Sequence, residues 1–144
     1  MTDTANMLDA SPASVPLGVG ALAAAIDACL NCVQACTSCA DSDLLEDDVE
    51  EMRRCVALDQ NCADVCDVGA RVLSRLGQWD AVAVYHQLQA CVRMCTSCAD
   101  ECDKHAAHHP HCAVCAGVCR ACVAACTTLL DAESFAPFAE RSAT

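Results

Sequence analysis

The sequence has few aromatic and few basic residues. Its 144 residues include one Trp, one Tyr and two Phe, and eight Lys and Arg stand against twenty Asp and Glu. The resulting net charge of −12 argues against nucleic acid or an anionic membrane surface as a partner, and its simplest role is solubility. The apolar share of 55% includes sixteen cysteines, so much of the expected core is thiol.

The first twenty residues lack the features of a signal peptide. They contain no basic segment followed by an apolar run, and they include Asp3, Asp9, Pro12 and Pro16. We therefore expect a disordered leader over residues 1–17. No run approaches the ~18 apolar residues of a membrane span. These absences predict a cytoplasmic protein, whose cysteines stay reduced unless metal binds them.

Turn and capping signals divide the first half of the chain into two helices. The first is expected from Gly18 to Asp41. Asp43 and Glu46 have the spacing of a capping box, and the acids that follow suit the positive end of a second helix. That helix is expected to reach about Leu76, with Gly77 as its C-terminal stop.

The second half of the chain repeats this pattern. A third helix is expected from Trp79 to His105, and Pro110 is well placed to open a fourth that ends near Asp131. Residues 133–144 are expected to form a loose tail, with Phe135 and Phe138 available to dock on the bundle.

An internal repeat relates the two halves. Residues 35–41, Ala-Cys-Thr-Ser-Cys-Ala-Asp, match residues 94–100 closely at an offset of 59, and Cys55, Cys62 and Cys66 fall on cysteines at an offset of 60. Two similar helical hairpins with short connections predict an all-α fold, an antiparallel up-down-up-down four-helix bundle over residues 18–132.

The cysteines form one stripe on each predicted helix. Their steps of three, four or seven residues are those of a buried seam, so each stripe should face the bundle axis and give a cysteine-lined core. The four stripes are Cys29, Cys32, Cys36 and Cys39; Cys55, Cys62 and Cys66; Cys91, Cys95, Cys98 and Cys102; and Cys112, Cys115, Cys119, Cys122 and Cys126.

Cysteine alone is too small to fill these layers. Helix axes ~8–10 Å apart need Leu-sized side chains to reach native density, and voids destabilise a core. One or two buried cysteines are commonly just small apolar residues, but sixteen in register indicate that metal ions fill the space. At one end, ordinary apolar residues are expected to form a plug that can hold the metal-free fold. This apolar plug comprises Leu22, Ile26, Val72, Leu73, Leu76, Val84, Leu88, Leu129 and Leu130.

Other ligand types lie near the opposite end, close to the loops 41–48 and 105–110. Each is three or four residues from a cysteine of a stripe, and together they predict a mouth through which metal enters. These residues are His105, His108, His111, Met52 and Asp59. The alternatives are a solvated histidine cluster and a gap-filling Met52. An unpaired carboxylate inside a bundle is costly, which makes Asp59 the more pointed candidate. His86 and His109 are weaker candidates.

Thiolate softness favours Cu(I), Zn(II) or an iron–sulfur cluster. Zn(II) needs separate tetrahedra, usually from loops, whereas the cysteines here lie in rows. The C-x2-C-x2-C run of iron–sulfur proteins does not occur. Cu(I) accepts two or three thiolates, so pairs at i and i+4 on one helix are candidate sites. These pairs are Cys32–Cys36, Cys62–Cys66, Cys91–Cys95, Cys98–Cys102, Cys115–Cys119 and Cys122–Cys126.

With its stripes and mouth, the chain resembles the bacterial copper storage proteins, in their cytosolic branch. The resemblance covers about residues 18–132 and rests on strings such as Cys29-Leu30-Asn31-Cys32 and Cys115-Ala116-Gly117-Val118-Cys119. It implies a preformed four-helix bundle, assembled as a homotetramer, that stores many Cu(I) ions in each protomer. Asp59 departs from an all-cysteine stripe.

Three other functions remain open on the sequence. They are a metallothionein-like zinc or cadmium buffer, a thiol redox enzyme, and a structural bundle with inert thiols. Disulfide geometry is hard to reach for CxxC pairs within one helix, which counts against redox chemistry. Because we find no catalytic pairing with a substrate pocket, we expect a storage protein and not an enzyme.

Overall fold

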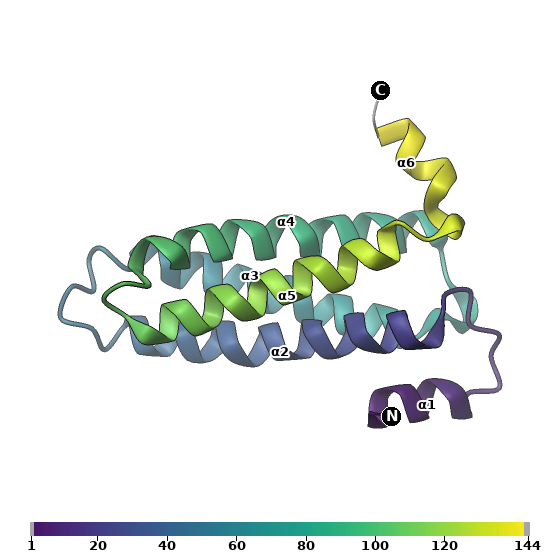
Figure 1. Ribbon diagram of the computed structural model, residues 1–144, viewed down its shortest axis with the longest axis horizontal. Helices are drawn as coiled ribbons and strands as arrows, with labels where there is room; N and C mark the ends of the chain where they lie inside the picture. The colour runs from purple at the N-terminus through teal and green to yellow at the C-terminus, as the bar shows by residue number, and fades with distance from the viewer. Residues whose placement is uncertain (1, 143–144) are drawn as a thin grey trace.

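The computed structural model describes residues 2–142, with side chains described for residues 2–139, and every regular element in that part of the chain is helical (Figure 1). The long helices are α2 (Val19–Asp43), α3 (Arg53–Leu73), α4 (Ala81–His105) and α5 (Pro110–Leu130). Shorter elements are α1 (Asp3–Ala10), α6 (Ala136–Ser142) and the 3₁₀ turns η1 (Leu76–Gln78) and η2 (Glu133–Phe135).

The four long helices lie side by side and are joined at alternate ends (Figure 1). α2 packs against α3 and α5, and α4 packs against the same two helices. The connections that follow α2 and α4 lie at one end of the bundle, and the connection from α3 to α4 lies at the other. Cysteines at the same level on different helices are thereby brought together.

Two helix starts have clear local causes, of which Pro110 was expected from the sequence. The Asp80 side chain accepts a hydrogen bond from the Ala83 N–H at 3.0 Å and caps α4. Pro110 is the first residue of α5, where its missing N–H costs no helical hydrogen bond.

The start of the second long helix was predicted wrongly. α3 begins at Arg53, and residues 44–52 form turns, although their acids resemble the first turn of a helix. Asp43 does not cap α3, because it is the last residue of α2 and is fully buried. Because the Asp43 side chain is directed into the bundle, the acids after it lie in the loop between α2 and α3.

The N-terminal segment differs from the disordered leader expected over residues 1–17. Residues Asp3–Ala10 form α1, which packs against α2. The Thr2 side chain accepts a hydrogen bond from the Ala5 N–H at 3.2 Å, and the Thr4 hydroxyl donates to Asp27 Oδ1 at 2.5 Å. An N-cap, a hydrogen bond to α2 and the burial of Ala5 thus order a segment whose composition suggests a loose end.

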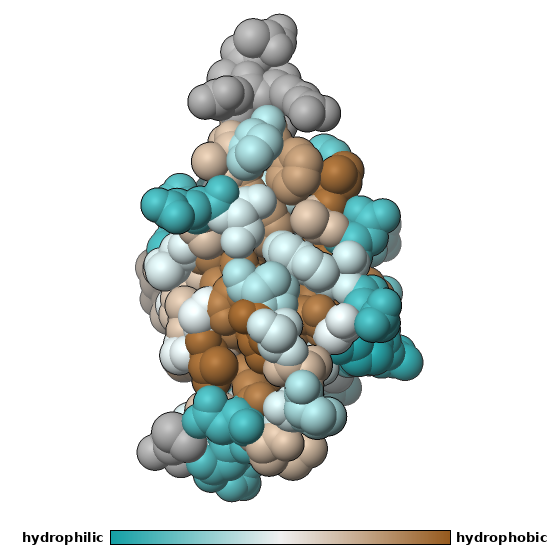
Figure 2. All heavy atoms as spheres, turned by 90° about the vertical axis from the view of Figure 1, so that its right-hand side faces the viewer, coloured by the Kyte–Doolittle hydropathy of each residue, from teal (hydrophilic) through white to brown (hydrophobic). Residues whose placement is uncertain are grey.

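The apolar plug is present at the end of the bundle where α1 and α6 lie. Leu22, Leu73, Leu88 and Leu129 are buried there. The C-terminal segment adds to the plug, because Phe135 is fully buried with its ring 5.7 Å from Trp79 and 5.8 Å from Tyr85. Figure 2 looks onto this end and shows apolar side chains between more polar ones at the edges.

Contrary to the expectation from apolar runs, helices α2 and α5 have the length and composition of a membrane span. Their mean hydropathies, over windows of membrane-spanning length, are 1.5 and 1.8, so both qualify by length and composition. The many cysteine, alanine and valine residues of the two helices raise these mean hydropathies. The cysteines on both helices are buried inside the bundle, and the core helix of a bundle passes the same test.

Candidate metal centre

All sixteen cysteines are free thiols that line the interior of the bundle. None exposes more than 2% of its surface. The steps of three and four residues along each helix cause this burial, since they keep the thiols on the side that faces the bundle axis. The sequence prediction of a thiol-lined core is therefore confirmed.

The sulfur atoms meet mainly across helices. Cys55 and Cys102 lie 3.5 Å apart, as do Cys66 and Cys95, and these pairs join α3 to α4. Among the same-helix pairs expected from the sequence, Cys122–Cys126 has its sulfurs in contact, at 3.9 Å. The shortest bridges available to a metal ion thus connect helices.

Neighbouring stripes assemble sets of four sulfurs whose atoms all lie within 4.8 Å of one another. One such set takes a cysteine from each long helix, and others take two from one helix. Examples are Cys32, Cys66, Cys95 and Cys122; Cys32, Cys36, Cys62 and Cys119; and Cys36, Cys98, Cys115 and Cys119. Rows of thiols on different helices therefore do form groups of four, contrary to the expectation from their spacing along single helices. What distinguishes this core is that the sets overlap, so that ions in adjacent sets must share sulfurs.

Asp59 lies inside this thiol core and is fully buried. Its Oδ1 accepts hydrogen bonds from the thiols of Cys98 at 3.0 Å and Cys115 at 3.4 Å. Burial raises the pKa of Asp59 to about 9, because the charged carboxylate loses its hydration there. The side chain is therefore a neutral acid at pH 7, which removes most of the cost of placing a carboxyl group among thiols.

The residues predicted at the mouth occupy different environments. The His111 Nδ1 lies 3.4 Å from the sulfur of Cys39, whereas His105 Nε2 lies 3.4 Å from Glu101 Oε1. Met52 is fully buried in the core, and His108 is exposed. Among the five candidates, Met52 and Asp59 thus lie in the interior, while His111 is partly exposed with a ring nitrogen against a thiol.

His109 is held in place by two carboxylates. It is 8% exposed, with Nε2 3.0 Å from Asp48 Oδ2 and Nδ1 3.2 Å from Glu46 Oε2. The hydrogen bond to Asp48 raises the pKa of His109 and lowers that of Asp48. His109 therefore ties its loop to the turns that follow α2, an arrangement for which a single sequence carries no local signal.

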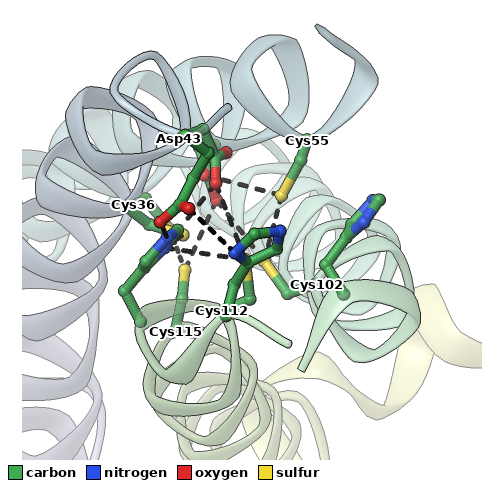
Figure 3. A network of polar contacts seen from close by, with 12 residues as sticks. Cys36, Asp43, Cys55, Cys102, Cys112 and Cys115 are labelled. Carbon is green, nitrogen blue, oxygen red and sulfur yellow. Dashed lines mark hydrogen bonds and ion pairs between the residues drawn. The ribbon is translucent and has the colours of Figure 1, made fainter. Parts of the chain in front are cut away.

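Asp43 was missed as a site residue. Its Oδ1 lies 3.6 Å from the Cys112 sulfur and 3.6 Å from His111 Nδ1, and burial raises its pKa to about 6. Figure 3 shows Asp43 beside Cys112, among the thiols. A signal was available in the sequence, since Asp43 lies four residues after Cys39 and 59 before Cys102, on the stripe and on the repeat.

Comparison with known proteins gives consistent matches. A family model described as copper storage protein matches residues 20–131. An uncharacterized cysteine-rich protein, YhjQ of Bacillus subtilis (strain 168), is 32% identical over 106 residues, which cover 74% of this chain and 93% of the relative.

Two solved structures of a Streptomyces lividans protein are also similar. The copper storage protein Ccsp loaded with 10 copper equivalents is 44% identical with a TM-score of 0.86, and the match covers 88% of this chain and 97% of that one. A cytosolic copper storage protein described with five coppers is 48% identical with a TM-score of 0.77, over 78% of this chain and 94% of that one.

Proposed function

Because the chain belongs to the copper storage protein family, we propose that the sixteen buried cysteines are the ligands with which it stores Cu(I). The observation that carries this proposal is the overlap of the four-sulfur sets, in which Cys32, Cys36 and Cys119 each belong to more than one set. Bridging thiolates suit a soft monovalent ion, since Cu(I) is satisfied by two or three sulfurs and a sulfur can serve two ions.

Loading replaces thiol protons with metal. Burial raises the pKa of Cys112, and the charges of Cys55 and Asp43 add to this effect, so the proton leaves only when a cation replaces it. The apolar plug holds the four helices together without metal, so we expect the binding sites to be formed before copper arrives. Copper storage then requires no folding step.

Entry of copper is assigned to the mouth, at the end opposite the plug. His111 is 22% exposed and has a ring nitrogen against Cys39, so it links solvent to the outermost thiols. We propose Met52 and Asp59 as interior ligands, and His105 and His108 as outer ones. The plug at the other end leaves the mouth as the route inward.

Four finer features accompany this function. Helices joined at alternate ends support the antiparallel up-down-up-down arrangement, with residues 18–132 as the storage domain. The Streptomyces protein is described as cytosolic, which supports a cytoplasmic location. We propose a homotetramer on the basis of the family resemblance. Overlapping thiol sets without a catalytic pairing favour binding over catalysis.

Titration of the reduced, metal-free protein tests the proposal. Cu(I) is added against a competing Cu(I) chelator while circular dichroism follows helicity, and Zn(II) is titrated in parallel. Copper storage predicts about one Cu(I) per thiol, bound to a protein that is already helical. Saturation at a few equivalents, or tighter binding of Zn(II) than of Cu(I) across the core, would overturn it.

A further inference from the structure

One group of four side chains near the mouth combines thiol, carboxylate and imidazole donors. Cys39, Asp43, His111 and Cys112 place two sulfurs, one carboxylate oxygen and one imidazole nitrogen within 4.8 Å of one another. They come from the last turn of α2 and the first turn of α5. We call these four residues the mixed-donor site.

Asp43 has an unmet bonding need at this position. The side chain is fully buried, and within the part of the chain that the structure describes its Oδ2 has no hydrogen-bond partner. A buried carboxylate oxygen without a partner costs free energy. A cation among the four side chains would supply the missing partner.

His111 is oriented as a metal ligand. Its Nδ1 faces the sulfurs of Cys39 and Cys112 at 3.4 and 3.6 Å, while its Nε2 lies 3.1 Å from Glu46 Oε1. When Glu46 accepts a hydrogen bond from the Nε2–H group, the lone pair is on Nδ1 and is directed at the site. Such outer carboxylates commonly hold the histidine ligands of metal ions in place.

We propose that the mixed-donor site binds one Zn(II) ion at the mouth, separately from the Cu(I) store. Two thiolates, one imidazole and one carboxylate form a complete set of four ligands of the types that Zn(II) takes. Cu(I) gains less than Zn(II) does from the carboxylate, which is a hard ligand. Binding releases the thiol protons of Cys39 and Cys112, so three anionic ligands face a divalent cation.

This assignment has a consequence for the order of events at the mouth. The four ligands lie at the outermost level of the thiol core, where α2 ends and α5 begins. Zn(II) held there occupies Cys39 and Cys112, which are also the outermost thiols of the store. Incoming Cu(I) must then displace it.

The test uses the reduced, metal-free full chain with one equivalent of Zn(II), examined by X-ray absorption. Zn(II) in the mixed-donor site gives two sulfur and two nitrogen or oxygen neighbours. Four sulfur neighbours for the first equivalent would place the ion in an inner set and overturn the proposal. Because wild-type protein is used, this readout does not depend on the folding of a variant.

Affinity measurements provide a second test. Asp43→Asn should weaken binding of the first Zn(II) equivalent by at least about tenfold in competition with a chelator, because it removes an anionic ligand. Asp41→Asn, an exposed change two residues earlier in α2, serves as the matched control and should bind as wild type does. Equal affinity in the two variants would overturn the proposal. Failure of copper storage would instead appear as a low Cu(I) capacity of the wild-type protein, so the two results are distinguishable.

Discussion

Replacement of Asp59 by Asn should change how the stability of the metal-free protein depends on pH. Asp59 has a pKa of about 9 in the folded protein, against 3.8 as its ordinary value. The folded state therefore holds this proton more tightly than the unfolded state does. The free energy of unfolding consequently falls as the pH rises from about 4 to about 9, by up to ~1.36 kcal/mol per pH unit.

The loss of stability at pH 7 is calculated from the difference between this pH and the ordinary pKa of Asp59. The difference of 7 − 3.8 units at ~1.36 kcal/mol each gives on the order of 4 kcal/mol of lost stability. Asp59→Asn removes this loss, but it leaves an amide among thiols at a cost of about 1–3 kcal/mol. The slope against pH is therefore the decisive quantity, because the cost of the amide is the same at every pH.

Urea unfolding of the reduced, metal-free protein between pH 5 and 7.5 measures this slope. Near the upper limit the sixteen cysteines of the unfolded chain, with an ordinary thiol pKa of about 8.5, add to the slope, but they add equally in the wild type and in both variants, so the difference in slope reports Asp59. Asp64→Asn, an exposed change on the same helix, is the control and should keep the wild-type slope. The Asp59→Asn variant should still lose stability with rising pH below about pH 6, but with a smaller slope than the wild type, because Asp43 has its own raised pKa of about 6. If Asp59→Asn has the same slope as the control over the whole range, the buried neutral acid is refuted.

Three further results are expected. Leu88→Ala should lower the free energy of unfolding of the metal-free protein, measured in urea, by about 2–5 kcal/mol, because it opens a cavity in the plug. The control Val114→Ala, at an exposed position, should change this free energy by less than about 0.5 kcal/mol. A loss of Cu(I) capacity in Leu88→Ala would contradict the separation of plug and store. Cys95→Ala should reduce the Cu(I) capacity, measured by chelator competition, more than Cys112→Ala does. The reason is that the Cys95 sulfur lies within 4.0 Å of three other cysteine sulfurs. Equal reductions would argue against shared sulfurs. Cu(I) loading at pH 7 should release about one proton per thiolate formed, as read with a pH indicator, and loading without proton release would show that the thiols were ionised beforehand.

The core of the bundle was predictable because its signal is periodic. Steps of three and four residues fix which side of a helix is buried, and Asp59 follows the same rule as the cysteines around it. The plug was predictable in the same way, from leucines such as Leu88 that continue the stripes. Both features depend on the position of a residue along its own helix, which the sequence contains.

Features that depend on contacts between segments were not predictable. The acids after Asp43 have the local pattern of a helix start, but the burial of Asp43 against Cys112 makes this segment a turn. His109 is held by Asp48 from a loop 61 residues away. The sulfur contacts mostly join helices, and their partners depend on the relative level of the four rods, which spacing within one helix does not give.

The close approach of sulfurs from different helices also offers copper a continuous route through the core. Neighbouring thiols on different helices lie 3.5 to 4.0 Å apart, as between Cys55 and Cys102 or Cys29 and Cys126, and the overlapping four-sulfur sets continue this spacing along the bundle. An ion can therefore advance by gaining one sulfur before it releases another, without ever being free and without a helix moving. Because the plug closes the inner end, later ions collect behind earlier ones. A protein loaded with one copper isotope and then with a second should give up the second isotope first.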